Sequence, residues 1–369
     1  MFATSFLRLV YRHAAKPFFF RRDPEDVHDA VSWIGERVGR FAFLRRLTAF
    51  FLRYQDAVLV QDVAGIRFPN PIGLTAGFDK NARLTGIMPD VGFGFEEIGS
   101  VTGEPCEGNP RPRLWRLPKS QGLVVYYGLK NDGCEAISAR LRRQAFRIPI
   151  GTSVARTNLP AFAGVEEGIA DYAKAFRAFA DIGEYFAVNV SCPNTCGGEP
   201  FTDPVRLEKL LTALDAIPTK KPVFLKIPVD APFEETRRLM EVAAAHRVQG
   251  FILSNLTKKR DRPEIVREEI AGLDKGGVSG RPTFAVGNEQ LSLAYQAFKH
   301  RFVFIASGGV FTAEDAYEKI RRGASLVQLA TGMIFEGPQL IGELNRGLAA
   351  LLRRDGYRSV AEAVGAAHR

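Results

Sequence analysis

A cysteine between two asparagines is the group in this chain best suited to proton chemistry. Cys192 lies in the segment Ala187–Gly197, where a strand-like apolar run ends at a Cys-Pro pair and continues into a polar, glycine-rich loop. Asn189 and Asn194 flank the thiol, and each amide can donate and accept hydrogen bonds. A thiolate can remove a proton from carbon, because free cysteine titrates near pH ~8.5 and its pKa can be tuned lower. A lone cysteine more often only packs, but this context favours a catalytic base.

Eight short apolar runs alternate with helical patterns from residue 61 onward, and these elements must position the thiol. The runs cover residues 71–75, 95–99, 148–151, 186–190, 223–227, 250–254, 302–306 and 324–329. Buried strands separated by helices favour parallel pairing, so the sequence predicts an α/β fold, a (β/α)8 TIM barrel. A doubly wound open sheet is the alternative, although no GxGxxG motif opens the first unit.

Polar and glycine residues follow these runs, at the ends where a barrel carries its active site. They are Lys80, Ser100, Asn189, Cys192, Asn194, Lys226, Ser254, Asn255 and the turns at 307–309 and 331–332. Loops after the seventh and eighth strands commonly bind phosphate through backbone N–H groups. Glycine lets the backbone approach an oxyanion closely, so Gly308 and Gly309 predict a phosphate site.

The first 54 residues differ from the rest and predict a helical extension (1–54) in front of the barrel (55–369). Asp23 at an N-cap, followed by Pro24, predicts a helix start. Phenylalanines and leucines are interleaved with arginines, which is typical of a helix at a membrane surface. A helical cap packed on the barrel is the alternative, and both can hold. No apolar run is long enough to span a bilayer as a helix.

The charge and cysteine content narrow the class of partner. The net charge is +9 and the pI is about 9.4, which suits anionic lipid or anionic small molecules. The barrel part has no basic stripe with interleaved aromatic residues, so no nucleic-acid partner is expected. The four cysteines have no CxxC spacing and no histidine partners, so no metal is expected, and free thiols suit a reducing compartment.

Several long motifs, in order along the chain, resemble the dihydroorotate dehydrogenase family. They are AGFDK (76–80), GFGFEEIGSVT (92–102), GNPRPR (108–113), NVSCPNT (189–195) and GASLVQL (323–329). The helical extension resembles that of the membrane-associated, quinone-dependent (class 2) branch. The resemblance implies FMN in a (β/α)8 barrel, oxidation of dihydroorotate to orotate in pyrimidine biosynthesis, and quinone as the electron acceptor. It also implies a peripheral membrane location, on the cytoplasmic side of the inner membrane if the source is bacterial.

The same resemblance implies roles for individual residues. Flavin-binding positions match Ala76, Gly77, Ser100, Lys226, Ser254, Gly280, Gly308, Gly309 and Thr331. Substrate-binding positions match Lys80, Asn189, Asn194, Thr195 and Asn255. Cys192 matches the base, which is serine in class 2 members and cysteine in the soluble class 1 members. Lys226 would stabilise negative charge on reduced flavin. Arg116 matches a position near the quinone tunnel. The resemblance also implies that the quinone arrives through the amino-terminal helices, so deleting residues 1–54 is expected to spare flavin reduction and impair reoxidation by quinone.

Four positions depart from the family pattern. Val125 stands where asparagine is expected, and so does Gly151, which is placed at the end of the third predicted strand. Leu256 replaces a threonine, and Ala330 replaces a tyrosine. An apolar side chain in a pocket that binds a pyrimidine leaves polar atoms of the ring without hydrogen-bond partners, and each unpaired atom costs about 1–3 kcal/mol of binding free energy. These departures leave open a different dihydropyrimidine or enone as substrate. A flavin-binding homologue that has lost catalysis is a further alternative.

Overall fold

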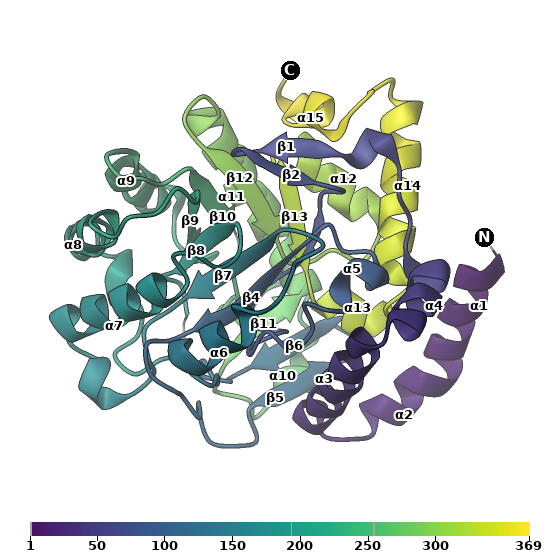
Figure 1. The fold of residues 1–369 in the computed structure, drawn as a ribbon, viewed down its shortest axis with the longest axis horizontal. Helices are drawn as coiled ribbons and strands as arrows, with labels where there is room; N and C mark the ends of the chain where they lie inside the picture. Colours follow the sequence, from purple (N-terminus) through teal and green to yellow (C-terminus); the bar gives the residue numbers. More distant parts are fainter. Residues whose placement is uncertain (1, 193, 254) are drawn as a thin grey trace.

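The computed structural model describes residues 2–192, 194–253 and 255–369, which fold around one closed barrel (Figure 1). The barrel strands are β3 (Ile72–Leu74), β4 (Phe95–Val101), β7 (Ile150–Val154), β8 (Tyr185–Asn189), β9 (Val223–Ile227), β10 (Gly250–Leu253), β12 (Val303–Ser307) and β13 (Leu326–Leu329). Neighbouring strands are parallel, and β13 pairs with β3 to close the ring. The predicted TIM barrel is confirmed, and each predicted run overlaps one barrel strand.

Helices surround the strands because each buries one apolar face against them. The longer ones are α6 (Cys134–Leu141), α7 (Val165–Ala178), α8 (Pro204–Asp215), α9 (Phe233–Ala244), α11 (Phe284–Phe298), α12 (Ala313–Arg321) and α14 (Leu340–Arg354). The shorter ones are α5 (Met88–Val91), α10 (Arg267–Ile270), α13 (Thr331–Glu336) and α15 (Val360–Ala363). In α8, the Asp203 side chain caps the backbone N–H of Arg206, and Pro204 opens the helix. Its buried residues recur at helical spacing: Leu207, Leu210, Leu211 and Leu214.

The lower half of the barrel interior is filled by large side chains. Phe95, Tyr185 and Phe224 form this layer, and each is at most 1% exposed. Gly151 makes room for it, because a Cβ there would lie 2.0 Å from the ring of Tyr185. The placement of Gly151 at the end of the third strand was therefore wrong. The strand runs on to Val154, and Gly151 lies near its start, inside the packed layer.

Two small antiparallel sheets cover the two ends of the barrel. β1 (Gln61–Val63) pairs with β2 (Ile66–Phe68), and their side chains pack on the filled lower layer. β5 (Leu114–Leu117), β6 (Gly122–Val125) and β11 (Gly277–Gly280) form a three-stranded sheet. Several of its residues line the cavity described below, so this sheet lies at the carboxyl ends of the barrel strands.

The amino-terminal segment is helical and lies at one side of the barrel (Figure 1). It comprises α1 (Phe2–Val10), a π-helical turn (Tyr11–Ala15), α2 (Lys16–Phe20), α3 (Pro24–Arg40) and α4 (Ala42–Leu52). Asp23 caps α3 as predicted, accepting hydrogen bonds from the backbone N–H groups of Glu25 and Asp26. Within the described part of the chain, no helix combines the length and apolar character that crossing a membrane requires.

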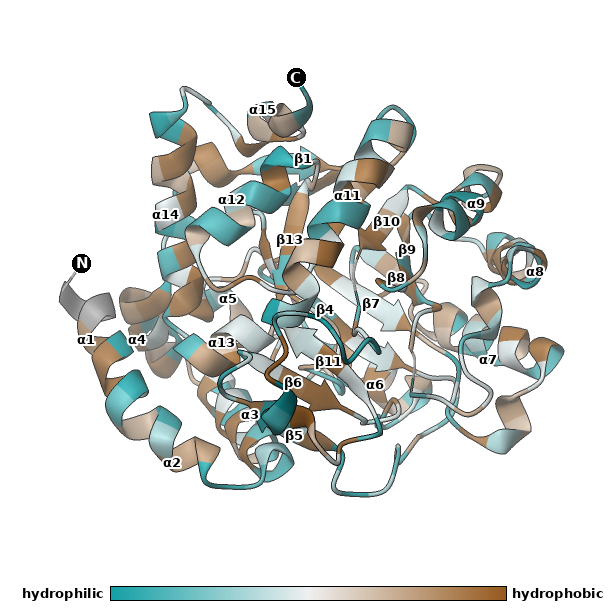
Figure 2. Ribbon diagram, turned by 180° about the vertical axis from the view of Figure 1, so that it is seen from behind, coloured by the Kyte–Doolittle hydropathy of each residue, from teal (hydrophilic) through white to brown (hydrophobic). Residues whose placement is uncertain are grey.

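Apolar side chains gather on the surface of this amino-terminal segment. Fifteen large hydrophobic residues are exposed among those the structure describes, and twelve of them lie between Phe6 and Phe51. Phe43 is 73% exposed and Phe50 is 80% exposed. Figure 2 shows hydrophobic positions on α1 and α4 at the edge of the molecule. Such a concentration of exposed apolar side chains on one segment indicates an interaction site.

Candidate active site

One cavity of about 210 Å³ lies at the carboxyl ends of the barrel strands. It brings together most of the predicted site residues, from loops that follow different strands. These are Ala76, Gly77, Lys80, Ser100, Asn189, Cys192, Asn194, Lys226, Asn255, Gly280, Gly308, Gly309 and Thr331. Thr195 lines a smaller cavity next to Cys192, and Arg116 lines neither. Ser254 lies outside the described residues. A set of residues so far apart in sequence converges only because the barrel forms.

A buried lysine stands at the floor of the cavity. The Nζ of Lys226 lies 3.2 Å from the Oγ1 of Thr75 and 3.7 Å from the Oε1 of Glu97. The side chains of Lys226 and Glu97 are 5% and 0% exposed. Glu97 also accepts a hydrogen bond from the amide of Gln328 at 2.8 Å. Sequence reasoning missed Glu97, although an acid inside a strand-like apolar run is a signal for a buried charge pair.

Two serines fix the amide of Asn189. Its Nδ2 donates to the Oγ of Ser100 at 2.9 Å, and that Oγ lies 2.8 Å from the Oγ of Ser153. Its Oδ1 accepts from the backbone N–H and the hydroxyl of Ser191. Ser153, and not Gly151, is therefore the polar residue that β7 contributes beside the site. Gly151 and Ser153 face the same side of the strand, and Ser153 lies two residues nearer its carboxyl end, so sequence reasoning placed the end of the strand too early.

Burial opposes ionisation of the Cys192 thiol. It raises the pKa of Cys192 to about 11, and the backbone N–H of Asn194 offsets this only in part. The neighbouring amides hold the loop in place. Asn194 donates to the carbonyl of Val125 at 2.8 Å, and Asn255 donates to the carbonyl of Ser191 at 2.8 Å. The sequence context suggested a lowered pKa for the Cys192 thiol, but its described surroundings raise that pKa.

A second cavity of about 10 Å³ lies on the other side of Cys192. Thr195, Tyr172 and Glu199 line it together with Cys192. A space of this size holds about one water molecule when its walls are polar. Burial raises the pKa of Glu199, which sequence reasoning did not single out. The thiol therefore stands between the large cavity and a small polar one.

Lys80 presents its ammonium group inside the large cavity. Its Nζ lies 4.0 Å from the centroid of the Tyr127 ring, a cation–π contact. Burial lowers the pKa of Lys80 to about 8, and Asp29 and Glu25 oppose that effect. A buried cation that is partly desolvated gains most from an anionic ligand, so this end of the cavity suits a carboxylate.

The other end of the cavity is apolar and meets the amino-terminal helices. Leu114, Leu123, Val310 and Ile334 line it. His28 of α3 lines it as well, with its Nε2 lying 2.8 Å from the carbonyl oxygen of Phe78. The hydroxyl of Tyr11 donates to the carbonyl of Ile334 at 2.6 Å, which fixes the first helices against this end.

Arg116 lies where β5 meets the same helices. Its Nη1 donates to the carbonyl of Arg22 at 2.8 Å, and its guanidinium lies 4.8 Å from the centroid of the Phe20 ring. The residue predicted for the quinone tunnel is therefore placed at the extension and away from Cys192. Its role stays a prediction.

Three of the four departures from the family pattern line the cavity. They are Val125, Leu256 and Ala330. Asn131 does not replace the missing amide, because its Nδ2 is bound to Thr102 and to the carbonyl of Leu129. Three other amide side chains line the cavity, those of Asn189, Asn194 and Asn255.

A wall of bare backbone closes the remaining side. Gly280, Gly308 and Gly309 have backbone φ angles of +88°, +85° and +75°, which residues other than glycine rarely adopt. A Cβ on Gly309 would lie 2.6 Å from the Cβ of Phe284. Thr331 completes this wall, with its Oγ1 2.9 Å from the Oγ of Ser279. Exposed backbone of this kind, beside a buried lysine and several amides, fits a phosphate-bearing flavin.

Comparison with known proteins agrees with this geometry. The family model described as dihydroorotate dehydrogenase matches residues 58–352. The dihydroorotate dehydrogenase (quinone) of Roseiflexus castenholzii is 37% identical over 359 residues, covering 96% of each chain. That of Synechococcus sp. (strain JA-3-3Ab) is 38% identical over 357 residues, covering 92% of this chain and 93% of the relative.

Solved structures give the same result. The crystal structure of DHODH from Eimeria tenella in complex with ferulenol superposes with a TM-score of 0.82 at 29% identity, covering 94% of this chain and 96% of that chain. The ligand-free type from the same organism gives a TM-score of 0.80 at 29% identity, covering 94% and 100%. By fold, by sequence and by the residues gathered at its cavity, the chain belongs to the dihydroorotate dehydrogenase family.

Proposed function

We propose that this protein oxidises dihydroorotate to orotate with bound FMN and delivers the electrons to a quinone. The observation that carries the proposal is one cavity with two chemically different ends. Cys192, Lys80 and three asparagines line one end, and apolar side chains against the amino-terminal helices line the other. A polar, charged substrate and a lipid-soluble acceptor would thus both find suitable groups at this one cavity.

The residues present fit FMN. The glycine wall at 280 and 308–309, with Thr331, would hold the phosphate, and Ala76, Gly77 and Ser100 would contact the ring system. When bound, FMN accepts a hydride from the substrate and gives up two electrons to the acceptor. Lys226 would lie at the ring, where its ammonium offsets negative charge. Glu97 behind it fixes the position of the ammonium group.

The substrate would be oriented by charge and by amides. The ammonium of Lys80 would pair with the carboxylate of dihydroorotate, and Asn189, Asn194, Thr195 and Asn255 would bind or support binding of the ring carbonyl and N–H groups. In the reaction one ring carbon loses a proton and its neighbour loses a hydride, so that a carbon–carbon double bond forms. Cys192 would accept the proton at its Sγ. The small polar cavity beside the thiol, lined by Thr195 and Glu199, would receive that proton.

The quinone would approach through the helices α1–α4. Their exposed apolar side chains and interleaved arginines suit the surface of an anionic bilayer. We therefore propose peripheral membrane association, on the cytoplasmic side of the inner membrane if the source is bacterial.

The proposal is tested by two half-reactions under anaerobic conditions. Dihydroorotate should bleach the flavin absorbance of the purified protein, and a short-chain quinone should restore it. A colourless protein that stays colourless after reconstitution with FMN would reject the cofactor.

A second substrate class remains open because Val125 and Leu256 line the cavity. Another dihydropyrimidine or an enone would need fewer polar partners at these two positions. Bleaching by such a compound, with no response to dihydroorotate, would favour this alternative. A flavin that no compound reduces would indicate a homologue without catalysis.

A further inference from the structure

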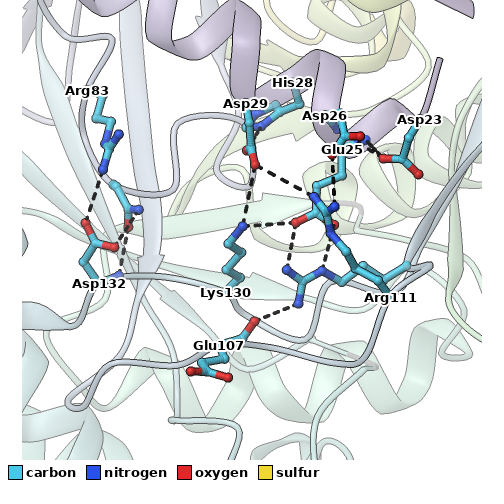
Figure 3. A network of polar contacts seen from close by, with 12 residues as sticks. Asp23, Glu25, Asp26, His28, Asp29, Arg83, Glu107, Arg111, Lys130 and Asp132 are labelled. Carbon is cyan, nitrogen blue, oxygen red and sulfur yellow. Dashed lines mark hydrogen bonds and ion pairs between the residues drawn. The ribbon is translucent and has the colours of Figure 1, made fainter.

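An acidic residue of the amino-terminal helices is buried against the barrel. Glu25 lies in the first turn of α3 and is 2% exposed. Its carboxylate receives both arms of Arg113, at 2.9 Å and 2.7 Å. Arg111 lies 3.0 Å away and Lys130 lies 3.1 Å away (Figure 3). One carboxylate therefore holds three cations that belong to the loops at the mouth of the barrel.

Arg113 extends this cluster to the loop that carries Cys192. Its Nη1 donates to the carbonyls of Glu107 and Asn109, at 2.7 Å and 2.6 Å. The side chain of Asn109 then donates to the carbonyl of Asn194 at 3.0 Å. Two residues thus connect the carboxylate of Glu25 to Asn194, a residue that lines the cavity.

A second connection reaches Lys80. The guanidinium of Arg113 lies 5.3 Å from the centroid of the Tyr127 ring, and the Nζ of Lys80 lies 4.0 Å from the same centroid. Lys130, which Glu25 binds directly, follows Tyr127 by three residues, and the segment 127–130 lines the cavity. Glu25 therefore contacts one end of this segment directly, at Lys130, and the other end through Arg113.

We propose that Glu25 is a positioning residue for the substrate, acting through Arg113 and Lys130 on the segments that carry Tyr127 and Asn194. This inference rests on the proposed function, because Lys80 and Asn194 are taken as substrate-binding residues. Loss of the negative charge would leave the guanidinium of Arg113, 7% exposed, without its anion. The amino-terminal helices then serve the substrate side of the enzyme as well as the acceptor side.

The test compares Glu25→Gln with Asp26→Asn. Asp26 is the adjacent acid and also contacts Arg111, at 3.0 Å, but its side chain is 66% exposed. For Glu25→Gln we expect the Kd of orotate, measured by calorimetry, and the KM of dihydroorotate to rise about tenfold, the size expected for one lost charged hydrogen bond. Flavin content and reoxidation by a short-chain quinone should stay near wild-type values. Asp26→Asn should change none of these quantities.

The pH dependence of orotate binding separates positioning from general destabilisation. The titratable groups that act on Lys80 include Asp29, Lys130, Glu25, Asp79 and His28. Glu25 favours the ammonium form, so its neutralisation should move the loss of affinity at alkaline pH to a lower pH. A variant that is only less stable would keep the wild-type profile.

Three outcomes overturn the inference. The first is normal orotate affinity in Glu25→Gln, and the second is an equal slowing of both half-reactions. If Glu25→Gln fails to fold, Arg113→Lys is used in its place, because it keeps the positive charge and removes the two-pronged guanidinium contact with Glu25. This variant should also weaken orotate binding, and unchanged orotate binding is the third outcome. A wild-type flavin that dihydroorotate does not reduce would instead reject the proposed function, and the inference with it.

Discussion

At Cys192 the proposed chemistry depends on a proton that burial holds on sulfur. The pKa of the Cys192 thiol is about 11. Below that value, the fraction of Cys192 present as thiolate increases about tenfold for each unit by which the pH rises. The rate of flavin reduction should therefore rise steadily with pH across the neutral and mildly alkaline range. Stopped-flow absorbance with dihydroorotate measures this directly, and a rate that levels off near neutral pH would contradict it.

Substitutions of the same residue test its role as the base. Cys192→Ala should slow flavin reduction by about 10²–10⁴-fold, the contribution usual for a positioned base. Cys192→Ser should be slower than wild type near neutral pH, with its profile moved to higher pH. Orotate affinity serves as the control, because it should change little. Normal reduction in Cys192→Ala would remove the thiol from the mechanism.

Lys80 predicts a second pH effect of opposite sign. Its pKa of about 8 means that the ammonium, and with it the attraction for a carboxylate, is lost as the pH rises through that value. The KM of dihydroorotate should rise above about pH 8. Lys80→Met should raise KM at neutral pH about tenfold or more and flatten this dependence. A KM that is independent of pH in the wild type would exclude Lys80 as the partner of the carboxylate.

Glu96 predicts a change in stability. It is 0% exposed, and burial beside Asp79 raises its pKa well above the usual range. In the unfolded chain, Glu96 releases its proton at about pH 4–5, whereas the folded state keeps it at higher pH. The stability that this group contributes at low pH is therefore lost as the pH rises toward the pKa of the folded state. Glu96→Gln should raise the Tm at pH values near 8, with the gain shrinking toward about pH 5. A gain that is equal at both pH values would contradict this reading.

At the scale of elements, the sequence predicted the barrel well because its eight strands are buried on both faces. Such strands appear as continuous apolar runs, which a reader can count. Strand ends are less visible, so Gly151 was misplaced and Ser153 was missed. The pairing of Glu97 with Lys226, and of Glu25 with Arg113, joins residues far apart in the chain, and no local pattern reports it.

The amino-terminal helices divide into two parts with different predicted effects. Removal of residues 1–20 takes away α1 and α2 but keeps Glu25. It should leave reduction by dihydroorotate near normal and slow reoxidation by a long-chain quinone. Removal of residues 1–54 also takes away α3, so both half-reactions should suffer, in contrast to the expectation from sequence. Equal behaviour of the two truncated proteins would contradict the division.

At the scale of the molecule, twelve of the fifteen exposed large apolar residues that the structure describes lie on the amino-terminal segment. Phe43→Glu combined with Phe50→Glu should weaken binding to anionic vesicles by about tenfold or more, because each buried phenylalanine contributes about 1.5–3 kcal/mol. Val205→Glu on α8, at a residue that is 69% exposed, is the matched control and should bind as wild type does. Cosedimentation with vesicles measures both. Equal loss in the two proteins would point to charge alone.

Under the proposed membrane association, the position of this apolar face determines which concentration of acceptor governs turnover. An acceptor dissolved in the bilayer and a protein bound to its surface meet in a plane, so the number of acceptor molecules per lipid governs their encounters. Adding pure lipid to a suspension of loaded vesicles would then slow turnover although nothing has been removed from the tube. With a water-soluble analogue of the acceptor, the added lipid would leave the turnover rate unchanged.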